Sequence, residues 1–284
     1  MKRFYLIANP SKNGAVEMAQ KMTEYLTSRG AFCEGSPQER QRGRDGCGYT
    51  DVSRIPACTE CVITLGGDGT LIQAARDLVK LHIPLLGVNM GTLGYLTQAN
   101  RGDRMEPLLD ALLTDNFRLE RRMMLQGCIS GPRGERHGLA LNDIVLTRQD
   151  AMQVLKFCVS VNGVVLNEYM ADGMIVATPT GSTAYNLSAG GPIVTPGAEL
   201  MVLTPICSHA LNSSSIVLSR GDTVDICLAG SARRKQAVVF DGDQMLEIAR
   251  DEILTIHRSG SYTTLIQLKN VSFLENLRDK MSRV

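Results

Sequence analysis

The sequence predicts an α/β protein in two parts: a parallel sheet covered by helices, followed by an antiparallel, sandwich-like β-rich domain. Up to about Arg121, short apolar runs alternate with segments of helical periodicity, as in a parallel sheet with helices on its faces. Beyond Arg121, short apolar runs follow one another with few helices between them, which is typical of antiparallel sheets. With 284 residues the chain can form one large or two moderate cores.

The first part alternates strands with helices. Residues 3–8 are an apolar run closed by Asn9-Pro10, and Val16, Ala19, Met22 and Leu26 then recur at helical spacing. Strands are predicted over residues 3–8, 61–65 and 83–88, and helices over 14–28, 70–81 and 103–116. Residues 34–50 are rich in Gly and Arg with almost no aliphatic side chain, so we expect a mobile surface loop, either solvated or folding over a ligand.

The second part carries hairpin signals. Asn162-Gly163 and Asp241-Gly242 each separate two apolar runs, and both dipeptides favour tight hairpin turns. Strands are predicted over residues 140–147, 154–161, 164–166, 174–178, 201–205, 215–218, 223–228, 237–240, 244–248, 253–257 and 263–268. Ser272 and Glu275 form a capping-box pattern for a last helix over residues 272–281, whose apolar stripe should dock.

Composition argues against several classes of partner. The 30 Lys and Arg nearly balance 29 Asp and Glu, for a net charge of +1, so no overall field attracts nucleic acid or an anionic membrane. The absence of Trp disfavours a base-stacking platform. No apolar run approaches the ~18 residues of a membrane span, and no signal-peptide pattern opens the chain. We therefore expect a cytoplasmic protein with reduced thiols.

One glycine-rich turn stands between a predicted strand and a predicted helix. Gly66, Gly67 and Gly69 let backbone amides approach a phosphate at a helix N-terminus, although the lysine of a P-loop is missing. Asp68 is unusual there, because a carboxylate repels phosphate unless it accepts a proton or holds Mg²⁺. The alternative interpretation of Asp68 is a plain helix cap in a tight turn.

Four further segments are candidates for ligand binding. Thr178 to Tyr185 combines small hydroxylated residues with Gly after an apolar strand, although such a segment is also common as a plain loop and helix cap. Asn142-Asp143 interrupts an apolar strand, and Asp172-Gly173 precedes another. The loop at 87–96, with Gly91 and Gly94, follows the carboxyl end of a strand, where open α/β sheets bind ligands.

The sequence offers little support for metal or covalent chemistry. The four His residues show no paired metal-ligand spacing, and no Ser/His/Asp set lies in a nucleophile elbow. Cys58 and Cys61 form a Cys-x-x-Cys pair that precedes an apolar run, whereas a redox motif would follow a strand and a zinc site would need two more ligands. We predict no resident metal site.

Taken in order along nearly the whole chain, these motifs resemble the ATP-NAD kinase family, within the superfamily of diacylglycerol kinases and 6-phosphofructokinases. The resemblance rests on Asn9-Pro10, residues 66–70, 91–96, 142–143, 172–173, 181–185 and 205–207, and the closing helix. It implies a Rossmann-like domain over 1–121, a β-sandwich-like NAD-binding domain over 122–269, a tail helix over 270–284 returning to the first domain, and NAD bound in a cleft between the domains.

The resemblance also implies a reaction and its residues. ATP with Mg²⁺ would phosphorylate the 2′-hydroxyl of the adenosine ribose of NAD to give NADP, with Asp68 as general base. The substrate-binding residues would be Gly66, Gly67, Gly69, Thr70, Tyr95, Leu96, Asn142, Asp143, Asp172, Thr180, Thr183, Ala184, Tyr185, Asn186, Leu187 and Ser188. A homodimer or homotetramer is the assembly expected from the family.

Three positions depart from the family pattern, namely Asp243 after Asp241-Gly242, Ser208 after Cys207, and Met170. They bear on the preference for NAD or NADH and for ATP or polyphosphate. Two other functions fit single features of the sequence. The Asp68 turn alone also fits a lipid kinase of the same superfamily, and the binding motifs without the reaction fit a non-catalytic NAD-sensing module.

Overall fold

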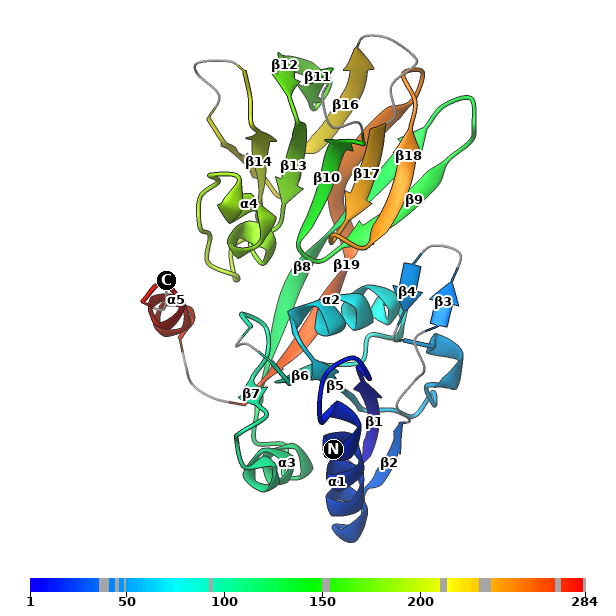
Figure 1. Ribbon diagram of the computed structural model, residues 1–284, viewed down its shortest axis with the longest axis vertical. Coiled ribbons are helices and arrows are strands. Elements are labelled where there is room, and N and C mark those ends of the chain that lie inside the picture. The colour runs from blue at the N-terminus through cyan, green and yellow to red at the C-terminus, as the bar shows by residue number, and fades with distance from the viewer. Residues whose placement is uncertain are drawn as a thin grey trace. The chain divides into compact units, whose positions relative to one another are not determined.

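The computed structural model describes residues 1–35, 41–43, 46–48, 50–91, 94–149, 154–209, 214–229, 236–268 and 272–282, with side chains outside 41–48. The chain forms two compact units, whose elements are labelled in Figure 1. The first unit comprises Met1–Arg122 and Tyr262–Val284, and the second comprises Met123–Ser261. Two long strands, β8 (Arg118–Ser130) and β19 (Ile253–Gln267), contribute to both units.

The first unit contains the predicted parallel sheet. Strands β2 (Phe32–Gly35), β1 (Arg3–Ala8), β5 (Cys61–Gly66) and β6 (Leu85–Asn89) lie side by side in that order, followed by the end of β19. All of these pairs are parallel, and the short β7 (Ala99–Asn100) adds to β6. Strand β5 is buried along its whole length, as its continuous apolar run predicts.

Three α-helices of the first unit belong to this parallel-sheet region. Helix α1 (Ala15–Ser28) buries Ala15, Ala19, Met22 and Leu26, and the face predicted from their spacing is confirmed except for Val16, which is exposed. Helix α2 (Asp68–Asp77) begins at the predicted glycine turn and is followed by the 3₁₀ turn η2 (Val79–Leu81), and α3 (Met105–Leu113) completes the set. Side chains of α1, α3, β1, β5 and β6 share one hydrophobic cluster.

The predicted loop at residues 34–50 is partly ordered by backbone pairing. Strands β3 (Gln41–Gly43) and β4 (Gly46–Gly48) form an antiparallel ribbon, and η1 (Val52–Arg54) follows. The predicted mobile surface loop therefore contains two short paired strands, because hydrogen bonds between strands need no aliphatic side chains. The rest of that prediction concerns residues 36–40, 44, 45 and 49, which lie outside the described residues.

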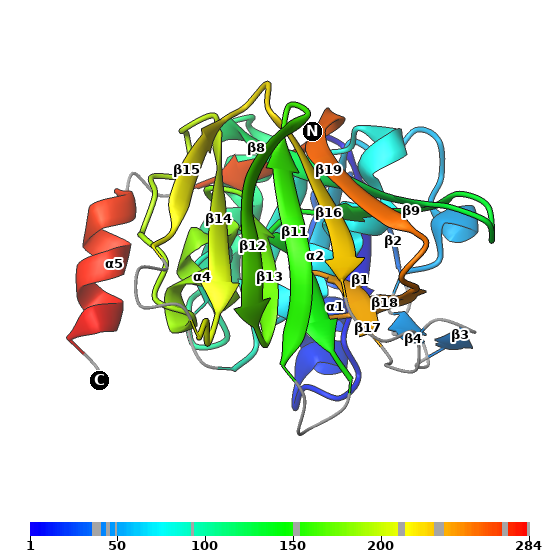
Figure 2. The ribbon, with the colours of Figure 1, turned by 90° about the horizontal axis from the view of Figure 1, so that it is seen from above.

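The second unit consists of two antiparallel sheets, as predicted. In one sheet β12 (Val164–Ala171), β11 (Leu155–Val161), β16 (Thr223–Ala229) and β19 are neighbours, and β8 pairs with β19 and β9 (Arg136–Ala140). Figure 2 shows β12, β11 and β16 side by side. The other sheet has the order β15 (Ile216–Ser219), β14 (Leu200–Ile206), β13 (Gly173–Ala177), β10 (Asp143–Arg148), β17 (Gln236–Phe240) and β18 (Gln244–Ile248).

The two sheets of the second unit share one core. Phe157 of β11 and Phe240 of β17 belong to the same buried cluster, although they come from different sheets. Both predicted hairpin turns are confirmed: Asn162 and Gly163 have positive φ (52° and 78°), as do Asp241 and Gly242 (52° and 70°), which is the geometry that Asn-Gly and Asp-Gly favour. No strand was predicted over residues 118–139, so β8 and nearly all of β9 were missed.

The last helix, α5 (Phe273–Met281), has the predicted capping box. The Ser272 hydroxyl accepts the Glu275 N–H at 3.2 Å, and the Glu275 carboxylate accepts the Ser272 N–H at 2.7 Å. The predicted docking through an apolar stripe is wrong in this structure, because no residue of α5 is buried. Phe273 and Leu277 are only half-buried, so capping accounts for more of this helix than packing does.

Candidate functional site

The glycine turn between β5 and α2 is shaped by Thr70. A Cβ on Gly66 would overlap the Thr70 hydroxyl, so only glycine fits at the end of β5. Thr70 itself is buried and accepts a hydrogen bond from the Asn9 side-chain amide at 3.0 Å. The sequence prediction placed Thr70 among the binding residues, and the structure gives its hydroxyl a partner in the Asn9-Pro10 motif. Gly67 and Gly69 have no atoms near a Cβ position and remain open.

Asp68 is held by the loop that follows β6. Its Oδ2 accepts the Tyr95 N–H at 2.6 Å, and its Oδ1 accepts the Leu96 N–H at 3.3 Å. A Cβ on Gly94 would overlap the Asp68 carboxylate, so this glycine is required for the close approach. The structure thus joins two motifs that the sequence predicted separately. Thr92 and Leu93 of the second motif lie outside the described residues.

A cation from the end of the chain lies beside this carboxylate. Lys280 of α5 places its ammonium 3.5 Å from the centre of the Tyr95 ring, a cation–π contact. Partial burial lowers the pKa of the half-buried Lys280, while the negative charge of Asp68 acts in the opposite direction. Burial and the Asp68 charge raise the pKa of the Tyr95 phenol. Asp68, Tyr95 and Lys280 therefore form one cluster in the first unit.

In the second unit the Asn142-Asp143 motif is organised by Asp241. The Asp241 carboxylate accepts N–H groups from three successive residues, Leu141 at 2.9 Å, Asn142 at 2.7 Å and Asp143 at 3.2 Å. The sequence pattern identifies Asp241 only as a hairpin residue, so these three hydrogen bonds from its carboxylate to residues 141–143 were not predicted. Asn142 Oδ1 is buried without a hydrogen-bond partner among the described residues, and such an acceptor is costly unless a ligand satisfies it.

Asp143 is a buried carboxyl group. Its burial and the nearby Asp241 charge raise the pKa of Asp143 to about 7, against about 3.9 in an unfolded chain. The folded state therefore holds this proton more tightly than the unfolded state does. The resulting stabilisation is complete below about pH 4 and is lost as the pH rises towards 7.

We expect Asp143→Asn to flatten the pH dependence of stability. Between pH 4 and 7 the free energy of unfolding of the wild type should lose up to about 1.4 kcal/mol per pH unit through this group, and the uncharged amide abolishes that loss. Urea titrations at pH 5, 6, 7 and 8 measure the difference. A constant gap between the two proteins over this range would contradict the assignment. Glu252, whose pKa is lowered to about 2 by the Arg133 hydrogen bond, titrates below the window.

The segment after β13 packs directly onto Asn142. The Thr178 hydroxyl donates to the Leu141 carbonyl at 2.6 Å and accepts the Gly181 N–H at 3.1 Å, and the Thr178 N–H donates to the Asn142 carbonyl at 2.8 Å. A Cβ on Gly181 would overlap the carbonyl oxygen of Asn142. The Asn142-Asp143 motif and the segment that starts at Thr178 therefore pack together. The 3₁₀ turn η3 (Gly181–Thr183) begins at this contact.

We expect Gly181→Ala to destabilise the second unit by about 1–3 kcal/mol, the usual cost of overpacking, because the obstructing atoms are backbone and cannot rotate away. The matched control is Gly197→Ala, where a Cβ meets no atom within 4 Å. Melting temperatures of the two variants and the wild type test this. Equal melting temperatures would show that the backbone of Asn142 yields.

The residues after this turn differ in their exposure. Asn186 of α4 (Tyr185–Ser188) is fully buried. Its Nδ2 donates to the Ser182 and Pro192 carbonyls at 3.1 and 3.0 Å, and its Oδ1 accepts a hydrogen bond from the Thr204 hydroxyl at 2.7 Å. Its side chain thus fastens the segment. Tyr185, Leu187 and Ser188 are exposed, Thr183 and Ala184 are half-buried, and Thr180 is buried.

Tyr185 lies near the second acidic motif, Asp172-Gly173. Burial raises the pKa of its phenol, with smaller effects from Cys207, Asp172 and Asp143. Asp172 itself forms an ion pair with Arg148 at 3.0 Å. The structure therefore brings Asn142, Asp143, Asp172 and the 180–188 segment together in the second unit, while Asp68, Tyr95 and Leu96 form their cluster in the first.

Comparison with known proteins identifies the family. The model of the ATP-NAD kinase N-terminal domain matches residues 48–117, and that of the C-terminal domain matches residues 141–268. A relative from Lachnospira eligens, named NAD kinase, is 42% identical over 99% of this chain and 100% of its own length. One from Agathobacter rectalis, also named NAD kinase, is 42% identical over 99% of both chains. The chain belongs to the ATP-NAD kinase family. It is thus a member of a family of enzymes, the kinases.

Two solved structures share the fold of this chain. Yeast NADH kinase complexed with NADH has a TM-score of 0.83 at 20% identity, covering 99% of this chain and 88% of that one. An NAD kinase from Archaeoglobus fulgidus in complex with ATP has a TM-score of 0.76 at 25% identity and covers 100% of both chains. The predicted α/β fold with a Rossmann-like first part and a sandwich-like second part is confirmed.

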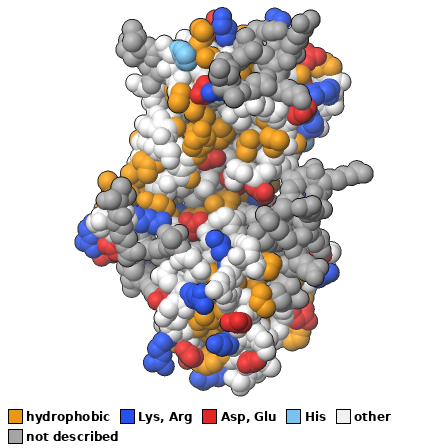
Figure 3. Space-filling model, viewed as in Figure 1, with side chains coloured by type: hydrophobic (Ala, Val, Ile, Leu, Met, Phe, Trp, Pro, Cys, Tyr) orange, Lys and Arg blue, Asp and Glu red, His pale blue; other side chains and the backbone are white. Residues whose placement is uncertain are grey.

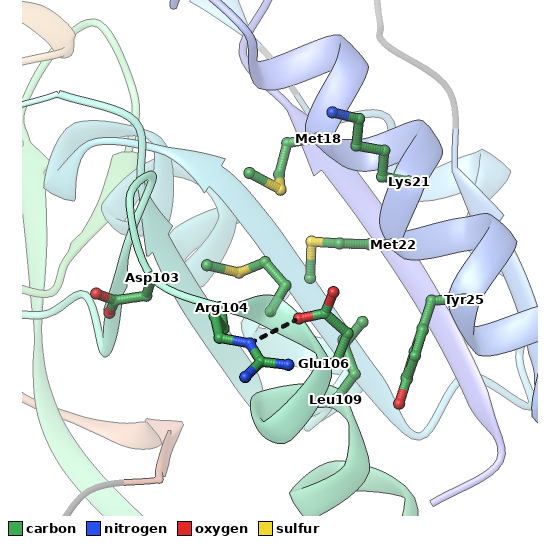
Figure 4. A pocket seen from close by; sticks show the side chains of 9 residues that line it. Met18, Lys21, Met22, Tyr25, Asp103, Arg104, Glu106 and Leu109 are labelled. Atoms are coloured by element: carbon green, nitrogen blue, oxygen red, sulfur yellow. Dashed lines mark ion pairs between the residues drawn. The ribbon is translucent and has the colours of Figure 1, made fainter.

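The other surface features of the chain do not involve the predicted site residues. A hollow of about 260 Å³ lies between α1 and α3 (Figure 4), floored by Met18, Met22 and Leu109. It holds none of the predicted site residues. Basic and acidic side chains are interspersed over the face drawn in Figure 3. Among the described residues, no helix combines the length and the hydrophobicity needed to cross a bilayer.

Proposed function

We propose that this chain transfers the γ-phosphate of ATP to the 2′-hydroxyl of the adenosine ribose of NAD, forming NADP. The observation that carries the proposal is the fixed carboxylate of Asp68 at the N-terminus of α2, bound by the Tyr95 and Leu96 amides. The relatives named NAD kinase and the ATP-bound neighbour support the choice of substrates.

Asp68 acts as the general base in this proposal. Phosphoryl transfer needs positioning, charge compensation and a proton acceptor for the attacking hydroxyl, but no covalent nucleophile. A carboxylate fixed by two amide donors cannot rotate freely, so an oxygen stays aimed at the hydroxyl proton. No atom lies within 4 Å of the Cβ position at Gly67 or Gly69, which leaves room for a phosphate at the N-terminus of α2.

The second unit supplies dinucleotide binding. Asn142 offers its unsatisfied Oδ1 to a hydroxyl or amino group of NAD. Asp143, Asp172, Thr180 and the exposed part of the 183–188 segment add acceptors and an aromatic face. We propose that Asn186 and Gly181 shape this surface through their buried contacts.

The residues around the turn are compatible with magnesium that arrives with ATP. Mg²⁺ prefers oxygen ligands and commonly binds substrate phosphates together with one or two carboxylates, and Asp68 provides a carboxylate within the phosphate-binding turn. Bound there, the ion would neutralise charge on the transferred phosphate. The ATP phosphates and water would supply most of the ion's ligands, so that the neighbouring Asp68 carboxylate still orients the hydroxyl and accepts its proton.

The direct test is turnover. The full chain is mixed with Mg²⁺, ATP and NAD, and NADP is detected with an NADP-specific dehydrogenase. We expect NADP to accumulate with time and enzyme concentration. Stabilisation by NAD without any product at micromolar enzyme would show a binding module and reject the proposal.

Lys280 takes the place of the missing P-loop lysine. Its ammonium lies over the Tyr95 ring beside Asp68, where a cation stabilises the outer phosphates of ATP. Lys280→Met should raise KM for ATP roughly ten- to a hundredfold, the size of a lost charged hydrogen bond, with KM for NAD little changed. Arg278→Met, on the same helix with 75% of its side chain exposed, is the control. Equal KM values for ATP in both variants would show that Lys280 does not bind ATP.

A further inference from the structure

The hairpin of β8 and β9 in the second unit brings together three side chains of the types that bind transition metals. Cys128 and His137 are directly opposite each other in the antiparallel register, so both point to the same side of the sheet. Glu135 lies just before β9, two positions from His137, and its carboxylate joins the same group of donor atoms. The alternate positions Gly127, Ile129 and Arg136 belong to the opposite side.

The three donor groups are already close together. One ligand atom from each of Cys128, Glu135 and His137 lies within 4.8 Å of the other two, and His137 Nε2 is 3.5 Å from Glu135 Oε2. Tetrahedral Zn²⁺ holds neighbouring ligand atoms roughly 3.5 Å apart, given bonds of about 2.0–2.3 Å. The histidine and glutamate donor atoms are already at that spacing, and no pair in the group is farther apart than 4.8 Å.

The backbone that carries these donors is anchored by the opposite face of the hairpin. The carboxylate of Glu252 is fully buried and pairs with Arg133 at 2.5 Å and Arg136 at 2.6 Å. A second nitrogen of Arg136 donates to the Glu247 carbonyl at 2.5 Å. Arg133 and Arg136 flank Glu135 in sequence, so these contacts fix the hairpin tip while Glu135 and His137 stay 69% and 51% exposed. A preorganised backbone lowers the cost of binding.

We propose that Cys128, Glu135 and His137 bind a single Zn²⁺ ion, with water as the fourth ligand. A thiolate, an imidazole and a carboxylate are the ligand types of zinc, whereas Mg²⁺ takes oxygen ligands alone. The site is therefore distinct in chemistry from any magnesium that accompanies ATP. Burial and the Glu135 charge raise the pKa of the Cys128 thiol, and a cation at this position offsets the unfavourable charge of the thiolate.

Metal titration of the full chain tests the site. Protein stripped with a chelator is titrated with Co²⁺, whose visible d–d bands and near-ultraviolet thiolate band report tetrahedral coordination by sulfur, and then with Zn²⁺ in competition. We expect one Co²⁺ per chain with a thiolate band, displaced by one Zn²⁺. Failure to bind one ion per chain, or binding without the thiolate band, rejects the site.

Variants locate the ion. Cys128→Ser and His137→Asn should each weaken Zn²⁺ binding by about tenfold or more, because removing even an outer-shell partner of a metal ligand costs about 10- to 100-fold. Glu135→Gln should weaken it too, and its exposed side chain leaves the fold intact. The control is Cys227→Ser, which removes an exposed thiol elsewhere in the second unit. Affinities in the three site variants equal to that of the control overturn the proposal. NADP formation plays no part in this test, so the proposed function stands or falls separately.

Discussion

Asp68→Asn should lower kcat for NADP formation by about 10²- to 10⁴-fold, the usual contribution of a general base, while KM for NAD changes little. Asn has nearly the same shape as Asp but cannot take a proton from the ribose hydroxyl. Its side-chain oxygen keeps one of the two amide hydrogen bonds from Tyr95 and Leu96, so the turn retains most of its local structure. Initial rates at saturating ATP over a range of NAD concentrations measure both constants.

The control for this substitution is Asp115→Asn in the same unit. Asp115 is largely exposed and has a positive φ of 55°, a conformation that Asn adopts readily. This variant should keep wild-type kcat. If Asp68→Asn also keeps wild-type kcat, Asp68 only anchors the loop at Tyr95 and Leu96, and another group accepts the proton.

Local patterns in the sequence predicted most of the fold. The continuous apolar run of β5 and the spacing of Ala19, Met22 and Leu26 in α1 determine burial within single elements, so they are visible without the structure. The turns at Asn162 and Asp241 follow from residue types that tolerate positive φ. Strand β8 was missed because its first half, Arg118–Arg122, is charged and mostly exposed.

The arrangement of the candidate site depends on contacts between distant residues, which periodicity does not encode. From its sequence context Asp241 is a turn residue. Its carboxylate accepts N–H groups of residues 141–143 because β17, which precedes it, pairs with β10. Cys128 and His137 lack metal-ligand spacing along the chain, and the β8–β9 register brings them together. Lys280 of the last helix lies over the Tyr95 ring, near enough to Asp68 for their charges to interact. Such groups were found by geometry alone.

The glycine at position 94 allows a sharper test of how Asp68 is positioned. A Cβ at Gly94 would overlap the Asp68 carboxylate, which is the mobile end of a side chain and can move away. We therefore expect Gly94→Ala to fold with nearly wild-type melting temperature but to displace Asp68 from the Tyr95 and Leu96 amides. Because a displacement of about 1 Å in a reacting group can cost ~10²-fold, kcat for NADP formation should fall by about that factor.

The same loop supplies the matched control for Gly94→Ala. Gly91 has no atom within 4 Å of a Cβ position and no positive φ, so Gly91→Ala adds the same methyl group to the loop without touching Asp68. Its kcat should stay near the wild-type value. Combining Gly94→Ala with Asp68→Asn should cost little more than Asp68→Asn alone, because both act through one carboxylate. Additive losses in the double variant would instead mean that Gly94 contributes to catalysis independently of Asp68.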